Sequence, residues 1–261
     1  IGTFTQVNGI TAAAGNFFDQ NREHVINLFG NDYSIAVVVT GILLTICVAL
    51  VVLGGIQRIA SVSSVIVPFM AVFYIIACIV ILVLNAARIP AAFAEIIQSA
   101  FGLRAAAGGA LGAVLIAMQK GIARGIFSNE AGLGSAPIAA AAAQTNEPAR
   151  QGLVTMTGTF IDTIIVCTMT GLCIVLTGSH TAGLEGVAVT TRAFQMGLPV
   201  PAQFSAFLLM MCLIFFAFTT ILGWDYYGER CLEYFTNGSR GAVRCYRWLY
   251  IAAVFVGPYL T

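Results

Sequence analysis

Long uncharged apolar runs alternate with short polar joins along this chain. Residues 34–56 and 64–87 contain no charged side chain, and the join between them carries Gln57 and Arg58. Each run is long enough for the ~20 apolar residues that a helix needs to cross a ~30 Å hydrocarbon core. The pattern therefore predicts membrane-spanning helices, which we place at residues 1–14, 34–56, 64–87, 105–143 (broken), 152–178, 203–223 and 248–260.

Two connecting segments are less apolar. Residues 88–104 include Pro90, Glu95 and Gln98, and predict a loop with an amphipathic or interfacial turn rather than a span. The segment 181–201 is rich in small residues and threonine, and we expect a long external loop with short helices there.

Composition supports a membrane environment. The chain of 261 residues is 59% hydrophobic and 9% charged, with a mean hydropathy of +0.93, whereas about a quarter of the residues of a soluble domain are charged. Its length leaves room for roughly six or seven crossings. We therefore predict an all-α, polytopic membrane helix bundle, formed as a single transmembrane domain over residues 1–261 and located in the cell (plasma or inner) membrane.

Charge and cysteine usage limit the possible binding partners and cofactors. The net charge is +1 and the basic residues are scattered, so we expect the lipid bilayer, and no nucleic acid, as a partner. The seven cysteines mostly lie singly in apolar runs without metal-ligand spacing, which predicts neither a redox function nor a cofactor. The chain opens at Ile1 without an initiator methionine and stops just after an apolar segment, and we expect both ends to be cut from something longer.

Candidate chemistry begins with charges inside the apolar segments. A charge in the hydrocarbon core costs roughly 2.5–3.5 kcal/mol on insertion scales, so Lys120, Arg124, Glu130 and Asp162 must be paired, reach an interface, or line a wet cavity. Four such residues in two neighbouring segments indicate an internal polar site. The structural alternative is that Arg124 and Glu130 satisfy each other, or that Lys120 and Arg124 extend to an interface.

The stretch Gly125–Pro137, GIFSNEAGLGSAP, places three glycines, two serines, an amide and a carboxylate where a continuous helix would otherwise run. Irregular backbone at membrane depth is tolerated only where it is buried in protein or lines a cavity, and transporters use discontinuous helices to bind substrates and cations. Close packing through small residues is the alternative. Packing accounts for the glycines and alanines but not for Asn129 and Glu130, so we favour a binding site.

A second polar point lies late in an apolar span. Thr219 and Thr220 are adjacent hydroxyls that could coordinate sodium, although threonine in a membrane helix more often bonds the carbonyl four residues earlier. Taken alone, Trp224 is typical of an aromatic belt residue at the membrane interface.

The segment Gly121–Gly178, GIARGIFSNEAGLGSAPIAAAAAQTNEPARQGLVTMTGTFIDTIIVCTMTGLCIVLTG, closely resembles the alanine or glycine:cation symporter family, the bacterial and archaeal sodium:alanine symporters. The stretches LVVLGGIQRIASVSSVIVPFMAVFYI, IPAAFAEII and FAFTTILGWDYYGERCLEYF extend the resemblance over nearly the whole chain. It implies part of a LeuT-type inverted-repeat transporter with a discontinuous helix, in which inward sodium flow drives uptake of alanine or glycine.

The resemblance also implies roles for particular residues. It assigns substrate binding to Gln6, Phe127, Ser128, Asn129 and Trp224, sodium binding to Thr219 and Thr220, and possible structural or gating roles to Arg124, Glu130 and Asp162.

Two departures from the family pattern matter. Ala140 stands where the family has histidine, which leaves the role of this position open. The family's first broken helix would precede Ile1, so we expect that this chain alone does not transport.

The implied mechanism is alternating access, with the substrate carboxylate meeting backbone N–H groups of the unwound helix. An intramembrane protease is a poor alternative because His24 and His180, the only histidines, lie in loops away from Ser135. An ion channel or another cation-coupled carrier of small solutes remains the alternative function. Saturable, sodium-dependent uptake separates carrier from channel.

Overall fold

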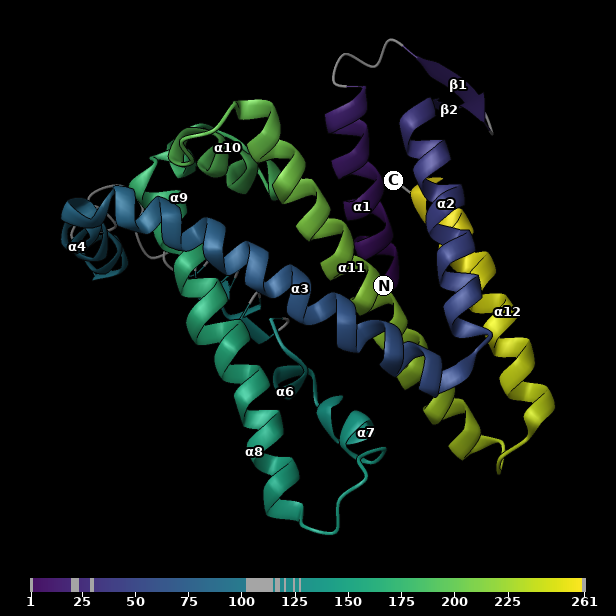
Figure 1. Ribbon diagram of the computed structural model, residues 1–261. Coiled ribbons are helices and arrows are strands. Elements are labelled where there is room, and N and C mark those ends of the chain that lie inside the picture. The colour runs from purple at the N-terminus through teal and green to yellow at the C-terminus, as the bar shows by residue number, and fades with distance from the viewer. Residues whose placement is uncertain are drawn as a thin grey trace. The chain divides into compact units, whose positions relative to one another are not determined.

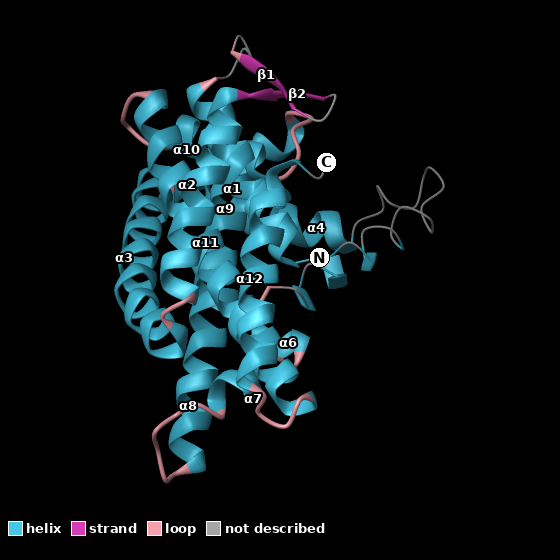
Figure 2. Cartoon of the chain, turned by 90° about the vertical axis from the view of Figure 1, so that its right-hand side faces the viewer, coloured by secondary structure: helices cyan, strands magenta, loops and turns pink. Residues whose placement is uncertain are grey.

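The computed structural model describes residues 2–19, 24–28, 31–101, 115, 118–119, 121–123, 125–126 and 128–259. The chain divides into two units: residues 1–76 with 199–261 form the first, and residues 77–198 form the second. The described residues are almost entirely helical (Figure 2).

The first unit is a group of helices that are distant in sequence. It contains α1 (Gly2–Phe18), α2 (Ile35–Val52), most of α3 (Gly55–Leu84), α11 (Ala202–Phe235), α12 (Arg240–Val256) and the short 3₁₀ helix η4 (Gly257–Tyr259). Helix α1 packs along α11 and α2, and α12 packs along the same two helices (Figure 1). Fully buried Val7, Val48, Ile221 and Val254 come from all four of these helices and form their common apolar interior.

A short hairpin joins α1 to α2 within the first unit and departs from the all-α prediction. Strands β1 (Val25–Leu28) and β2 (Asn31–Ser34) pair antiparallel, with Val25 opposite Ser34 and Leu28 opposite Asn31. The Asn27 side chain donates to Asp32 over 2.8 Å across the pair. Ser34 then caps the N-terminus of α2, because its hydroxyl accepts from the backbone N–H of Ala36.

The second unit begins with the end of α3 and continues through η1 (Ala86–Arg88) and α4 (Ile89–Phe101). After the interrupted segment come α6 (Glu130–Leu133), α7 (Ala136–Ala140), α8 (Pro148–Thr159), the π-helical segment η2 (Phe160–Cys167), α9 (Thr168–Leu176), η3 (Ser179–Thr181) and α10 (Val187–Gly197). Ala92 of α4 packs against Leu172 and Leu176 of α9 and forms part of the core of this unit.

Among the described residues, four stretches of helix are long and apolar enough to cross a membrane: Ile35–Val52, Gly55–Leu84, Pro148–Leu176 and Ala202–Phe235. Only 17–33% of the most apolar window of each is buried by the protein itself. So much exposed apolar surface would be unfavourable in water, and a hydrocarbon surrounding removes that cost.

Several helix boundaries differ from those expected from hydropathy. Helix α3 begins at Gly55, not at residue 64, and α11 continues to Phe235, twelve residues beyond the predicted 223. Helix α12 begins at Arg240, not at 248, and ends at Val256, short of the predicted 260, while residues 89–101 form α4 where a loop was expected. At the start of α3, the end of α11 and the start of α12, polar residues end the apolar window without ending the helix, because a helix satisfies its own backbone hydrogen bonds in lipid and in water alike.

Candidate functional site

The helix before α6 is interrupted near Ser128 and Asn129. Residues 121–123 and 125–126 are helical, Ser128 and Asn129 form a turn, and α6 is a short helix that ends at Leu133 with Gly134 as its C-cap. Gly134 has a φ of +74°, a backbone conformation that glycine adopts without strain, and α7 follows after Ser135. Gly132 lies so close to the carbonyl group of Ile126 that a Cβ at this position would overlap its oxygen.

The oxygen and the nitrogen of the Asn129 side-chain amide are both hydrogen-bonded. Its Oδ1 accepts from the backbone N–H groups of Ala131 at 3.1 Å and Gly132 at 3.3 Å, which makes it the N-cap of α6. Its Nδ2 donates to Thr163 Oγ1 at 2.8 Å. The residue therefore sets the direction in which α6 begins and ties the interruption to η2.

Ser128 also forms a hydrogen bond to η2. Its hydroxyl donates to Asp162 Oδ2 at 2.8 Å and lies 3.6 Å from Cys167 Sγ. Asp162 and Thr163 are neighbours on η2, whose π-helical turns interrupt the regular helix formed by α8 and α9. Such π-helical segments occur frequently at functional sites. Two irregular backbone segments thus face each other through two side-chain hydrogen bonds.

Asp162 and Thr163 complete this polar group, and Ser135 follows it along the chain. The family resemblance assigned Asp162 only a possible structural or gating role, and the structure makes it the acceptor for Ser128. Thr163 was not singled out, although it follows Asp162 directly in the motif TFIDT. Ser135 is buried, and its hydroxyl has no hydrogen-bond partner within the described part of the chain. Its place at the start of α7 was visible in the sequence, but its burial was not.

For the other residues that the sequence predicted in this segment, the structure shows no hydrogen bond to η2 among the described residues. Glu130 is the first residue of α6 and is exposed. Arg124, Phe127 and Lys120 lie outside the described residues, so the expected pairing of Arg124 with Glu130 and the substrate contact of Phe127 stay predictions.

Thr219 and Thr220 lie on α11 in the first unit, and both are half-buried. The Thr219 hydroxyl lies 3.1 Å from the carbonyl oxygen of Phe215 and 3.0 Å from that of Phe216, and Thr220 donates to Phe216 over 2.9 Å. These are the local bonds expected for threonine in a membrane helix. A hydroxyl that donates its proton in this way keeps its oxygen lone pairs as acceptors, which is the form in which it can bind a cation.

Gln6 and Trp224 occupy neighbouring helices of the first unit. The indole ring of Trp224 on α11 lies directly against Gly2 of α1, where a Cβ would be 3.2 Å from the ring nitrogen. Gln6 is four residues after Gly2, hence one helical turn further along the same side of α1. Trp224 also makes an edge-to-face contact with Tyr227, with ring centroids 6.1 Å apart.

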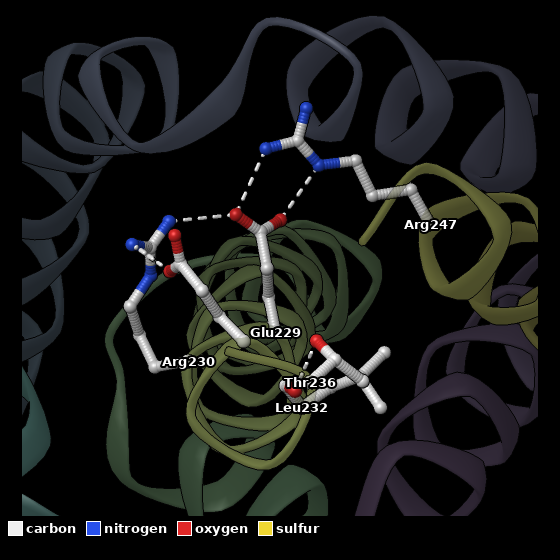
Figure 3. A network of polar contacts seen from close by, with 6 residues as sticks. Glu229, Arg230, Leu232, Thr236 and Arg247 are labelled. Carbon is white, nitrogen blue, oxygen red and sulfur yellow. Dashed lines mark hydrogen bonds and ion pairs between the residues drawn. The ribbon is translucent and has the colours of Figure 1, made fainter. Parts of the chain in front are cut away.

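An ion-pair cluster at the end of α11 was not anticipated as a functional feature. Glu229 accepts two bonds from Arg247 of α12, at 2.6 and 2.8 Å, and one from Arg230 at 2.7 Å (Figure 3). Arg230 also pairs with Glu233. A cavity of about 460 Å³ adjoins this cluster, and its lining includes Glu229, Arg230, Glu233, Arg244 and Arg247.

Over the residues that the structure describes, no three histidine, cysteine, aspartate or glutamate side chains are grouped so as to hold a metal ion. The expected ion is sodium, which binds neutral oxygen atoms as well as carboxylates. Hydroxyl groups such as those of Thr219 and Thr220 are suitable ligands for it.

Several apolar helices of membrane-spanning length, with polar side chains gathered at interrupted helical backbone, define a polytopic helical membrane protein of the transporter class. The chain belongs to the sodium:alanine symporter family, whose sequence profile it matches over residues 1–261. This confirms the resemblance carried by the GIFSNEAGLGSAP motif. The family consists of sodium-coupled amino-acid transporters and not of enzymes.

Individual relatives agree with this assignment. The chain is 54% identical to an uncharacterized transporter of Haemophilus influenzae, over all of this chain and 53% of the relative. It is 44% identical to a sodium/alanine symporter of Methanococcus maripaludis, over 93% of this chain and 52% of the relative. It is 37% identical to a probable sodium/glutamine symporter of Bacillus subtilis, over 95% of this chain and 51% of the relative. The chain thus spans about half the length of the curated relatives it matches.

Proposed function

We propose that this chain forms part of a secondary active symporter that couples inward sodium flow to the uptake of small neutral amino acids, alanine or glycine. The observation that carries the proposal is the pair of hydrogen bonds from Ser128 and Asn129 at the interrupted helix to Asp162 and Thr163 on η2. Broken helices of this kind present polar groups to substrates at membrane depth in secondary transporters.

The chemistry of this polar group suits an amino-acid zwitterion. Asp162 accepts from Ser128 and makes no ion pair with the described residues, and a carboxylate at this position can bind a substrate ammonium group. The cap formed by Asn129 already uses the N–H groups of Ala131 and Gly132. We infer that the substrate carboxylate meets other backbone N–H groups at the interruption, as the alternating-access mechanism of a LeuT-type inverted repeat requires.

The remaining residues receive roles in the same proposal. The family resemblance carries these roles: the hydroxyl oxygens of Thr219 and Thr220 bind sodium, and Gln6, Trp224 and Phe127 are proposed as substrate-binding residues. The small residues around the interruption, such as Gly132 and Gly134, favour a small substrate.

The test is uptake of labelled alanine and glycine into proteoliposomes that hold the whole protein, with and without an inward sodium gradient. We expect sodium-stimulated uptake in the wild type, and its loss in Asn129→Ala, which removes both the cap and the bond to Thr163. Thr220→Ala should require a higher sodium concentration for half-maximal uptake, because one proposed sodium ligand is missing.

Asn85→Ala is the matched control. Asn85 is also a half-buried asparagine at a helix end in the second unit, but among the described residues its side chain donates to the carbonyl of Ile81 and not to a residue of the interruption or of η2. It should keep sodium-stimulated uptake. Uptake that ignores sodium, or that is strong for glutamine and absent for alanine and glycine, would reject the proposed coupling or the proposed substrate respectively.

A further inference from the structure

Asp225 is the most completely enclosed charged residue of the described chain. It lies on α11, none of its surface is exposed, and neither carboxylate oxygen has a hydrogen-bond partner among the described residues. A buried ionised carboxylate without hydrogen bonds or a counter-ion carries a penalty of several kcal/mol, which a protein avoids by pairing the group or by neutralising it.

Pairing within the described chain does not neutralise Asp225. The ionisable groups that face it are Glu229 one turn further along α11, and Tyr246, Arg247 and Tyr250 on α12. Helix α1 carries no ionisable side chain, and α2 carries only the exposed thiol of Cys47. Glu229 adds like charge, and Arg247 directs its Nε and one Nη atom to Glu229.

Arg230 and the Tyr250 hydroxyl, which lie near Asp225 or its ion-pair cluster, also have other partners. Arg230 is shared between Glu229 and Glu233, so the three carboxylates of this part of α11 face only two guanidinium groups in hydrogen-bonded pairs. The hydroxyl of Tyr250 donates to the Ile221 carbonyl at 2.7 Å and contacts Thr3 at 3.0 Å. One negative charge therefore stays uncompensated if Asp225 is ionised.

We propose that Asp225 is a proton-binding site of the carrier and is held as a neutral carboxylic acid in the arrangement seen here. Its protonation forms one O–H bond on the carboxylate, and the proton comes from a hydronium ion, which is left as water. The water can reach the neighbourhood through the cavity lined by Glu229 and Arg247, one helical turn from Asp225. Sodium fits less well, because it requires several oxygen ligands and the nearby Tyr250 hydroxyl oxygen already contacts Thr3 at 3.0 Å while donating its proton to Ile221.

This site would add a second ion to the transport cycle. Asp225 follows Thr219 and Thr220 on α11 by about one and a half turns, so the proposed sodium ligands and the proton site share one rigid helix. A conformational change that exposes Asp225 to water would release its proton. The transport consequence rests on the proposed function, whereas protonation of Asp225 does not.

The direct test is infrared difference spectroscopy of the whole purified protein, titrated from neutral to alkaline pH. We expect the C=O stretching band of a carboxylic acid without hydrogen bonds, which disappears in Asp225→Asn and shifts in Asp225→Glu. Glu233→Gln is the matched control, because it removes a neighbouring carboxylate that is already paired with Arg230, and it should keep the band. Absence of the band in the wild type, or its survival in Asp225→Asn, would overturn the proposal.

A transport experiment tests the functional part separately. Proteoliposomes with trapped pH dye and equal sodium on both sides should acidify inside when alanine is added, and Asp225→Asn should lose this signal while sodium-driven alanine uptake continues. Sodium-driven uptake without acidification in the wild type would reject proton transport by Asp225 but keep the symporter assignment. Absence of uptake under every gradient would reject the proposed function itself.

Discussion

Glu229 shows how a carboxylate is kept ionised within a helix of membrane-spanning length. Its side chain is almost fully buried, yet Arg247 and Arg230 supply three hydrogen bonds to its two oxygens. Arg247→Met should remove two of these bonds and leave the charge poorly compensated. Removal of one partner from a buried ion pair costs roughly 3–5 kcal/mol, so we expect a clear loss of thermal stability in detergent.

Arg244→Met provides the control for this substitution. Arg244 lies on the same helix and lines the same cavity, but it makes no ion pair with the described residues. It should change the melting temperature little. A double variant, Glu229→Gln with Arg247→Met, should recover part of the loss because no charge is then left unpaired. Equal melting temperatures for Arg247→Met and Arg244→Met would contradict this account.

Individual residue types indicated part of this chemistry in the sequence. Asn129 and Asp162 stood out because polar groups are costly in an apolar segment, and the structure connects their neighbourhoods by hydrogen bonds. Asp225 and Glu229 were overlooked because they follow the predicted end of an apolar window, where charges are ordinary. Their burial depends on α12, which is adjacent in space and contributes Arg247. Hydropathy along one segment contains no information about such a neighbour.

At the interrupted helix, the backbone of Gly132 lies very close to that of Ile126, and this contact can be tested by adding a single methyl group at Gly132. A Cβ at Gly132 would overlap the carbonyl oxygen of Ile126, so Gly132→Ala should force α6 away from the preceding helical turn. Overpacking of this kind costs typically 1–3 kcal/mol. We expect a lower melting temperature in detergent and a weakened binding of labelled alanine, since Asn129 caps the same short helix.

Gly171→Ala is the corresponding control, because Gly171 lies inside helix α9 with nothing near the position of an added Cβ. Alanine favours a helix interior over glycine by about 1 kcal/mol, so this variant should be neutral or slightly stabilising. If Gly132→Ala behaved like Gly171→Ala, the close approach of α6 to Ile126 would be wrong.

At the level of elements, long apolar runs were more informative than their borders. The helices within 34–56, 152–178 and 203–223 all exist near the expected positions, because an uninterrupted apolar run of this length has few alternatives to a helix in lipid. The hairpin at residues 25–34 lacked such a signal, since its strands are four residues each and half polar. The π-helical turns of η2 have no distinctive residue pattern, and only the structure reveals them.

For the whole molecule, the exposed apolar surface of the spans defines where hydrocarbon must lie. Val72 is near the middle of α3 and 54% exposed, whereas Val83 is 67% exposed near its end. Arginine at the centre of a membrane helix costs roughly 2.5–3.5 kcal/mol on insertion scales, while near an end its side chain reaches the interface. Val72→Arg should therefore reduce insertion of α3 into microsomal membranes, measured by glycosylation mapping, much more than Val83→Arg does. Equal insertion of the two variants would mean that hydrocarbon does not surround the middle of α3.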